Sequence, residues 1–308
     1  MATVDPKLAV KFCGISMKNP IVAASGTFGF GLEYDGYLDL NTEVGAISVK
    51  GLTPTARPGN AGVRIAETPS GVLNCIGLEN PGAEAFVADI LPNLKQYDVP
   101  IFANISGNTL EEYEYMAKTL TVEGVAALEV NISCPNVKCG GMAFGVQAES
   151  AAAVCKAVKA HTDLPVIMKL SPNVTDIVEI ARAVEAAGAD GISMINTLLG
   201  MSVDLRTRKP LLGNIYGGLS GPAVKPVALR LTHRVAQAIE IPIMGGGGIM
   251  TGEDALEFML VGADIVSVGT ATMVDPRAIG IIASEMSAYC ESQHIEHVSN
   301  LVGGIIMP

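Results

Sequence analysis

Eight short apolar runs recur along the chain, and each ends in a small or polar residue. The runs are Ile21–Ser25, Ala46–Lys50, Pro100–Asn104, Ala127–Asn131, Pro165–Lys169, Gly191–Asn196, Ile241–Gly245 and Asp264–Gly269. A continuous apolar run of this length is typical of a parallel strand that is buried on both faces of its sheet. The pattern therefore predicts eight buried parallel strands.

Helical periodicity lies between several of these runs. Thr109 and Glu112 form a T-x-x-E capping box, and apolar residues then recur on one helical face. A second apolar face begins at Ile177 and stops before Gly188, and Thr251 opens a third helix. Strands and helices thus alternate along the chain.

This alternation predicts the fold class. Eight strand and helix pairs indicate an α/β fold, a (β/α)8 TIM barrel. We interpret residues 1–308 as one domain, in which the Gly- and Pro-rich stretch 198–226 forms a long loop after the sixth strand. A doubly wound open sheet is the alternative. It usually has fewer strands and a G-x-G-x-x-G fingerprint after the first one, and that fingerprint is missing from the first strand here.

Composition limits the function classes that fit this fold. The chain carries 20 Lys and Arg against 31 Asp and Glu, and the formal net charge of −11 argues against a nucleic-acid or anionic-membrane surface. Gly, Pro or a charge interrupts every apolar stretch, so no transmembrane helix is expected. The first residues, 1–5, have neither a basic nor an apolar region, so no signal peptide is expected either. The six cysteines are scattered, which predicts reduced thiols in a cytoplasmic protein without a metal centre.

Polar residues stand at the carboxyl ends of the predicted strands, where barrels of this kind build their active sites. They include Ser25, Lys50, Asn104, Asn131, Lys169, Asn196 and Thr197. Each lysine alone is equally well explained by a side chain that reaches for solvent. Because lysine is rarely buried without a partner, two lysines beside three asparagines favour a shared anionic or carbonyl-rich ligand.

Glycines follow the seventh and eighth strands. Gly245–Gly248, and the pair Gly269 and Thr270, occupy positions where barrels often bind a phosphate through backbone N–H groups. A turn explains any single glycine, but four in a row beside the eighth-strand pair indicate a phosphorylated substrate or a phosphate-bearing cofactor.

Cys134 lies just past the fourth strand, on a predicted loop. A lone cysteine is usually a small buried hydrophobe. Here the flanking Asn131 and Asn136, with Gly140 and Gly141 nearby, favour a loop that carries chemistry. A thiol near cations can act as a base or a nucleophile.

Taken as a set, these motifs resemble the class 1 dihydroorotate dehydrogenases, the flavin enzymes of pyrimidine biosynthesis. The resemblance runs nearly end to end, through NPIVAASGTFG (19–29), SVKGLT (48–53), LNCIGLEN (73–80), FANISG (102–107), NISCPNVKCGG (131–141), VIMKLSPN (166–173), INT (195–197), GGLSGPAVKP (217–226), GGGGI (245–249) and VSVGTA (266–271). The cysteine in the NISCPNVK loop resembles that of class 1 enzymes, because class 2 members carry serine at this position. The continuation 138–141 resembles subclass 1B more than 1A.

The resemblance implies one FMN per chain across the barrel mouth. It assigns the phosphate to Gly247, Gly248, Gly269 and Thr270. It assigns the ring and ribityl chain to Ser25, Lys50, Gly51, Asn104, Asn131, Lys169 and Ile195, with Gly221 touching the cofactor from the long loop.

The resemblance also implies that dihydroorotate stacks on the flavin. Its contacts are Lys50, Asn74, Asn131, Asn196 and Thr197, with the backbone of Cys75, Ile76, Gly77 and Leu78 nearby. Cys134 takes the proton from C5 while FMN takes the hydride from C6, which yields orotate. A lysine beside the flavin, Lys50 or Lys169, would stabilise the negative charge of the reduced ring.

Subclass 1B further implies a heterotetramer, in which a homodimer of this chain binds two subunits that carry FAD and a [2Fe–2S] cluster and pass electrons to NAD. Subclass 1A, which uses fumarate, competes with this assignment. So do a flavin barrel that acts on a different pyrimidine, a phosphosugar Schiff-base barrel that uses Lys169, and a catalytically silent binding barrel. The intact Cys134, Lys50 and Lys169 weigh against the silent barrel.

Overall fold

A computed structural model describes residues 5–132 and 144–308. Its centre is a closed barrel of eight parallel strands, which confirms the predicted (β/α)8 TIM barrel. Around the barrel the strands follow chain order: β3 (Ile21–Ala23), β4 (Ala46–Ser48), β7 (Ile101–Ile105), β8 (Ala127–Asn131), β9 (Val166–Lys169), β10 (Gly191–Met194), β15 (Ile243–Gly246) and β16 (Ile265–Val268). The last of them pairs with the first, where Ser267 lies opposite Val22.

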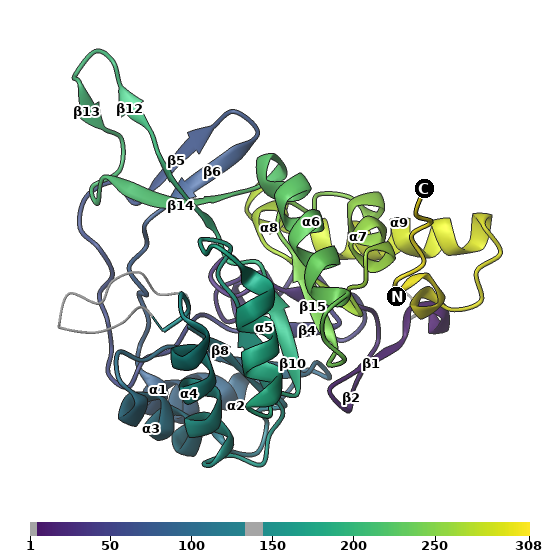
Figure 1. The fold of residues 1–308 in the computed structure, drawn as a ribbon, viewed down its shortest axis with the longest axis horizontal. Coiled ribbons are helices and arrows are strands. Elements are labelled where there is room, and N and C mark those ends of the chain that lie inside the picture. The colour runs from purple at the N-terminus through teal and green to yellow at the C-terminus, as the bar shows by residue number, and fades with distance from the viewer. Residues whose placement is uncertain (1–4, 133–143) are drawn as a thin grey trace.

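Helices cover the outside of the barrel (Figure 1). They are α1 (Ala83–Ala85), α2 (Leu91–Leu94), α3 (Leu110–Leu120), α4 (Ala148–Lys159), α5 (Ile177–Ala186), α6 (Lys225–Ala236), α7 (Gly252–Leu260), α8 (Thr270–Val274) and α9 (Ala278–Ser292). A π-helical turn, η3 (Phe86–Ile90), joins α1 to α2, and single 3-10 turns form η1 (Pro6–Leu8), η2 (Leu32–Tyr34), η4 (Pro222–Val224) and η5 (Val298–Leu301). The apolar faces of the helices and the outward side chains of the strands form the main core.

The three predicted helices are confirmed as α3, α5 and α7. The predicted capping box of α3 is only half formed: Thr109 accepts a hydrogen bond from the Glu112 N–H, but the Glu112 carboxylate accepts from the N–H of Asn108, one residue before the cap. Helix α7 has the complete reciprocal box, between Thr251 and Asp254. These caps fix where the helices begin, and thus where each preceding loop leaves the barrel mouth.

An antiparallel hairpin closes the amino-terminal end of the barrel. Its strands are β1 (Val10–Phe12) and β2 (Ile15–Met17). Phe12 and Met17 pack against barrel side chains such as Phe102 and Met244 in a second, smaller apolar cluster. This end of the barrel is therefore filled, and the opposite end carries the open cavity.

A four-stranded antiparallel sheet lies over the carboxyl end. Its order is β11 (Leu198–Met201), β14 (Tyr216–Ser220), β6 (Gly71–Asn74) and β5 (Ile65–Thr68), and the hairpin of β12 (Val203–Asp204) and β13 (Lys209–Pro210) projects beyond it (Figure 1). The stretch 198–226, expected to be a long loop or insertion after the sixth strand, contains four short strands and the start of α6. Glycine hides the strand pattern but permits close pairing: a Cβ on Gly217 would lie 2.8 Å from the carbonyl oxygen of Asn74.

No helix among the described residues is both long and apolar enough to cross a membrane.

Candidate functional site

The carboxyl ends of the barrel strands open into a cavity of about 640 Å³. The described residues that the resemblance assigned to FMN or dihydroorotate meet in its wall, except for Gly221. They are Ser25, Lys50, Gly51, Asn74, Cys75, Ile76, Gly77, Leu78, Asn104, Asn131, Lys169, Ile195, Asn196, Thr197, Gly247, Gly248, Gly269 and Thr270. Gly245 and Gly246 of the predicted phosphate run belong to β15 and do not line the cavity. Cys134, the predicted base, lies outside the described residues.

Gly221 lies directly behind the glycine loop rather than in the wall. A Cβ on Gly248 would be 2.8 Å from the Gly221 carbonyl oxygen and 2.9 Å from the backbone nitrogen of Lys225. Gly248 also has a φ of +88°, which side chains rarely adopt. The loop after β15 is thus a close-packed turn of bare backbone beside the start of α8 at Thr270, an arrangement that suits an anion such as phosphate.

Lys50 and Lys169 approach the cavity from different strands. Lys50 follows β4, and burial lowers the pKa of its ammonium, while the charge of Glu79 acts in the opposite direction. Lys169 ends β9 and its side chain is 13% exposed. Two partly buried cations in one cavity favour a ligand with negative charge or carbonyl oxygens.

Glu129 is a buried carboxylate behind the cavity that the sequence did not single out. It lies in the middle of β8, is 1% exposed, and its carboxylate lies 3.4 Å from the Lys169 Nζ. Ser48, Asn104 and Ser193 also donate hydrogen bonds to it. Burial raises the pKa of Glu129, but Lys169 and the three donors outweigh it, so the pKa lies below its usual value and the group is a carboxylate. A charge inside the apolar run ALEVN was the signal that could have revealed it.

Asn104 contributes an acceptor to the cavity. Its Nδ2 donates to Glu129 at 2.6 Å, and its buried Oδ1 has no partner among the described residues. A Cβ on Gly51 would lie 2.9 Å from this oxygen, so the glycine leaves the space beside the oxygen free of side-chain atoms. A buried unpaired acceptor is costly, and a bound molecule with an N–H or O–H group would satisfy it.

Three amides form a polar edge of the cavity. Asn196 donates to the Asn131 side chain at 3.5 Å, and the hydroxyl of Tyr113 donates to the Asn131 carbonyl at 2.8 Å. Asn74, on β6 of the covering sheet, donates to the Gly218 carbonyl at 3.2 Å. Amides both donate and accept, so this edge matches the alternating N–H and C=O groups of a pyrimidine ring.

The cavity is also lined by polar residues that the sequence did not single out, among them Asn60, Ser171, Asn173, Asn214 and Tyr216. Asn173 has a clear structural task, since it donates to the Thr197 carbonyl at 2.9 Å and accepts from the Leu199 N–H at 2.9 Å. In the sequence, the Ser-Pro-Asn motif just after the fifth barrel strand could have indicated that Asn173 lies at the cavity.

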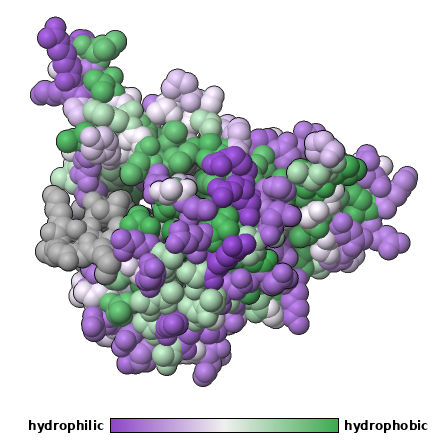
Figure 2. Space-filling model, viewed as in Figure 1, coloured by the Kyte–Doolittle hydropathy of each residue, from purple (hydrophilic) through white to green (hydrophobic). Residues whose placement is uncertain are grey.

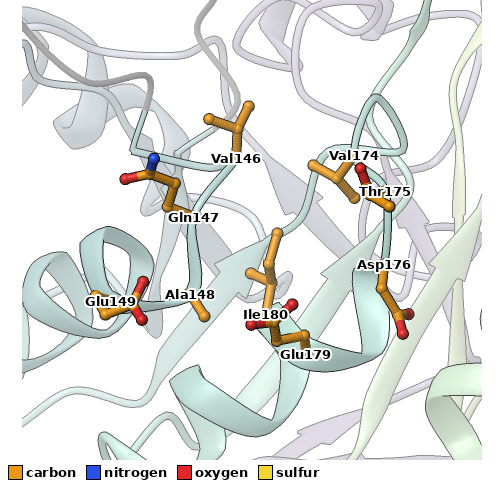
Figure 3. Close-up of a pocket in the computed structure, with 9 residues that line it drawn as sticks. All are labelled: Val146, Gln147, Ala148, Glu149, Val174, Thr175, Asp176, Glu179 and Ile180. Atoms are coloured by element: carbon orange, nitrogen blue, oxygen red, sulfur yellow. The ribbon is translucent and has the colours of Figure 1, made fainter.

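A second pocket, of about 350 Å³, lies between the starts of α4 and α5 (Figure 3). Val146 and Val174 lie on opposite sides of it, and its charged groups are carboxylates, among them Glu149 and Asp176. Asp176 is already engaged, because it caps α5 and pairs with Arg234 at 3.2 Å. Without a lining cation, this pocket does not suit the anionic ligand that the mouth cavity favours.

Fold and cavity together define a (β/α)8-barrel protein whose ligand site lies at the carboxyl ends of the strands. The model of the family described as dihydroorotate dehydrogenase matches residues 7–289. The chain therefore belongs to the dihydroorotate dehydrogenase family.

Curated relatives share nearly their whole length with this chain. It is 58% identical to the catalytic subunit of dihydroorotate dehydrogenase B (NAD(+)) of Desulforamulus reducens, over 96% of this chain and 97% of that protein. It is 55% identical to the protein of the same name from Desulforudis audaxviator, over 96% and 97%. The corresponding protein of Geobacter sp. strain M21 is 52% identical, over 97% and 98%.

Proposed function

We propose that this chain is the catalytic subunit of an FMN-dependent dihydroorotate dehydrogenase, which oxidises dihydroorotate to orotate in pyrimidine biosynthesis. The observation that carries the proposal is the cavity itself, which unites two lysines, several asparagines and a glycine cradle at one barrel mouth. The names of the full-length relatives support the same activity.

The described residues fit FMN. The backbone of Gly247, Gly248, Gly269 and Thr270 would hold the phosphate, and Ser25, Lys50, Gly51, Asn104, Asn131, Lys169 and Ile195 would line the ring and ribityl chain, with Gly221 behind the cradle. The free acceptor of Asn104 fits this group, because an isoalloxazine ring and a ribityl chain both carry hydrogen-bond donors.

Dihydroorotate would meet the polar side of the same cavity. Lys50 suits its carboxylate, and the amide edges of Asn74, Asn131 and Asn196 suit its ring. Thr197 and the backbone of Cys75, Ile76, Gly77 and Leu78 complete the contacts. The substrate thus lies between the barrel mouth and the covering sheet.

Cys134 is the proposed base, which removes the proton from C5 of the substrate. When FMN is bound, it supplies the acceptor for the hydride from C6. Lys50 and Lys169 favour negative charge in the cavity, and Glu129 limits that effect on the side of Lys169. An ordinary thiol has a pKa of about 8.5, so the rate should rise with pH until Cys134 ionises.

We also propose that the chain forms a homodimer within a heterotetramer, together with a subunit that carries FAD and a [2Fe–2S] cluster and delivers electrons to NAD. The words "NAD(+)" and "catalytic subunit" in the names of the relatives support a separate electron-transfer partner. Exposed apolar side chains on the projecting hairpin, such as Val203 and Leu205, are consistent with association (Figure 2). The free thiols of Cys13, Cys75, Cys155 and Cys290 fit a cytoplasmic location.

Anaerobic mixing with dihydroorotate tests the proposed activity. The purified chain should be yellow, and its visible flavin absorbance should bleach on mixing. Fumarate, or a partner with NAD, is then offered to identify the electron acceptor. A yellow protein that does not bleach, with or without the partner, would indicate a different substrate. A colourless protein that does not bind added FMN would refute the flavin site and favour a Schiff base on Lys169.

A further inference from the structure

Glu129 lies behind the wall of the cavity rather than in it. Two of the groups that contact its carboxylate, Asn104 and Lys169, line the cavity. The other two, Ser48 on β4 and Ser193 on β10, are buried inside the barrel and do not. The carboxylate therefore connects two wall residues to β4 and β10, each of which lies two strands away from β8 in the barrel.

The carboxylate decides which end of the Asn104 amide faces the ligand. A carboxylate only accepts hydrogen bonds, so Asn104 must turn its Nδ2 toward Glu129, where the two atoms lie 2.6 Å apart. Its Oδ1 is left pointing toward Gly51, which lines the cavity. An acceptor fixed in this direction selects a donor group on the bound molecule.

The same carboxylate holds Lys169. Its Oε1 accepts from Ser193 at 2.7 Å and lies 3.4 Å from the Lys169 Nζ. Attraction between opposite charges is strong where water is scarce, so the ammonium is held at the wall with its charge partly balanced. A flavin in the cavity would experience less positive charge from Lys169 than from an unpaired lysine.

We propose that Glu129 is a positioning residue of the flavin site: it presents the Asn104 Oδ1 as an acceptor to the cofactor and moderates the charge of Lys169. The inference rests on the FMN site proposed above. It gives Glu129 no contact with substrate or cofactor and no part in proton transfer.

The variant Glu129→Gln tests both effects with little change in size. Gln has one acceptor and one NH2 group, whereas the ammonium of Lys169 only donates. The amide oxygen is therefore expected to stay with Lys169, and the NH2 group to face Asn104. Asn104 then turns over and presents donors to the cavity.

Two readouts follow from this change. The Kd of the purified chain for FMN, measured by quenching of FMN fluorescence, should rise about tenfold, because a donor of the ligand loses its acceptor. The midpoint potential of the bound FMN should shift to a more positive value, because a buried negative charge has been removed.

Asp190→Asn is the matched control. Asp190 also forms an ion pair with a lysine, Lys159, at 2.8 Å and accepts a hydrogen bond from the Val166 N–H, but it precedes β10 at the other end of the barrel. The control should keep the affinity and potential of the wild type. If Glu129→Gln also keeps both, the inference is overturned.

A second variant decides the matter if Glu129→Gln does not fold. Ser193→Ala removes one donor to the carboxylate without altering the cavity wall, and FMN affinity should fall about threefold. Unchanged affinity overturns the inference. The wild type separates the two proposals. If the wild-type chain does not bind FMN, the flavin site is refuted. If it binds FMN and bleaches, and the variants bind FMN equally well, only the role of Glu129 is refuted.

Discussion

Replacing Gly248 by alanine tests the proposed phosphate cradle, and Gly188→Ala provides a matched comparison. Both glycines have left-handed backbone, with φ of +88° at Gly248 and +95° at Gly188. A Cβ on Gly188, at the end of α5, would have nothing within 4 Å. The two substitutions therefore share the backbone cost and differ in the steric cost.

The structure gives a magnitude for each variant. A left-handed alanine costs about 1–2 kcal/mol at either position. At Gly248 the new Cβ would also lie 2.8 Å from the Gly221 carbonyl oxygen and 2.9 Å from the Lys225 nitrogen, both of which are backbone atoms. Separating them adds about 1–3 kcal/mol, as overpacking does elsewhere. We expect Gly248→Ala to lose about 2–5 kcal/mol of unfolding free energy in total.

The same displacement should weaken FMN binding. Loss of one hydrogen bond to a charged phosphate costs about 1.5–3 kcal/mol, which corresponds to a rise in Kd of roughly ten- to a hundredfold. Gly188→Ala should bind FMN like the wild type. Urea unfolding of the FMN-free chains gives the stabilities, and fluorescence titration gives the affinities.

Two results would refute this reasoning. Equal loss of unfolding free energy in the two variants would show that the backbone of Gly221 moves away from the new Cβ without an energetic cost. Unchanged FMN affinity in a folded Gly248→Ala variant would show that the phosphate does not lie at this turn.

Further predictions concern the base, a buried carboxylate and the core. Cys134→Ala should keep its flavin but slow flavin reduction by dihydroorotate by about 10²–10⁴-fold in anaerobic stopped-flow, and an unchanged rate would remove Cys134 from the mechanism. The pKa of Glu129 is lowered on folding, so its ionisation stabilises the protein above its unfolded pKa of about 4.3, and this contribution disappears as pH falls through the folded value. The difference in unfolding free energy between the wild type and Glu129→Gln should thus be smaller at pH 3 than at pH 7. An equal difference at the two pH values would contradict this prediction. Phe258→Ala should cost about 3–5 kcal/mol in urea unfolding, because the ring is fully buried, whereas Tyr37→Ala at an exposed ring should stay within about 0.5 kcal/mol.

The barrel strands were predictable because their signal is local. All five residues of β7 are buried, so the strand appears as an apolar run in which Asn104 is the only polar residue. The predicted run Ile21–Ser25 extends beyond β3, which ends at Ala23, since the chain then turns over the mouth with Gly26 at a φ of +89°. Strand ends, and with them the residues of the cavity wall, were therefore located to within a few positions.

Features that depend on distant partners were not predictable in this way. Strand β6 of the covering sheet pairs with β14, where Leu73 lies opposite Leu219, and no local pattern links two segments so far apart. The charge of Glu129 stands out inside ALEVN, but its hydrogen bonds were not predictable, because Ser48 and Ser193 become its partners only when the barrel closes. The place of Cys134 in the predicted site stays a prediction.

The pairing of β3 with β16 determines when the binding site can exist during synthesis. The first barrel strand cannot pair with β16 until residues 265–268 have left the ribosome, and such long-range closure is slow. Gly247, Gly248, Gly269 and Thr270 are made close in time to β16, whereas Ser25 and Lys50 are made long before it. A nascent fragment therefore cannot capture the proposed cofactor. Because a ligand that binds only the finished fold stabilises it by mass action, the cellular supply of FMN would set how much of the newly made protein persists.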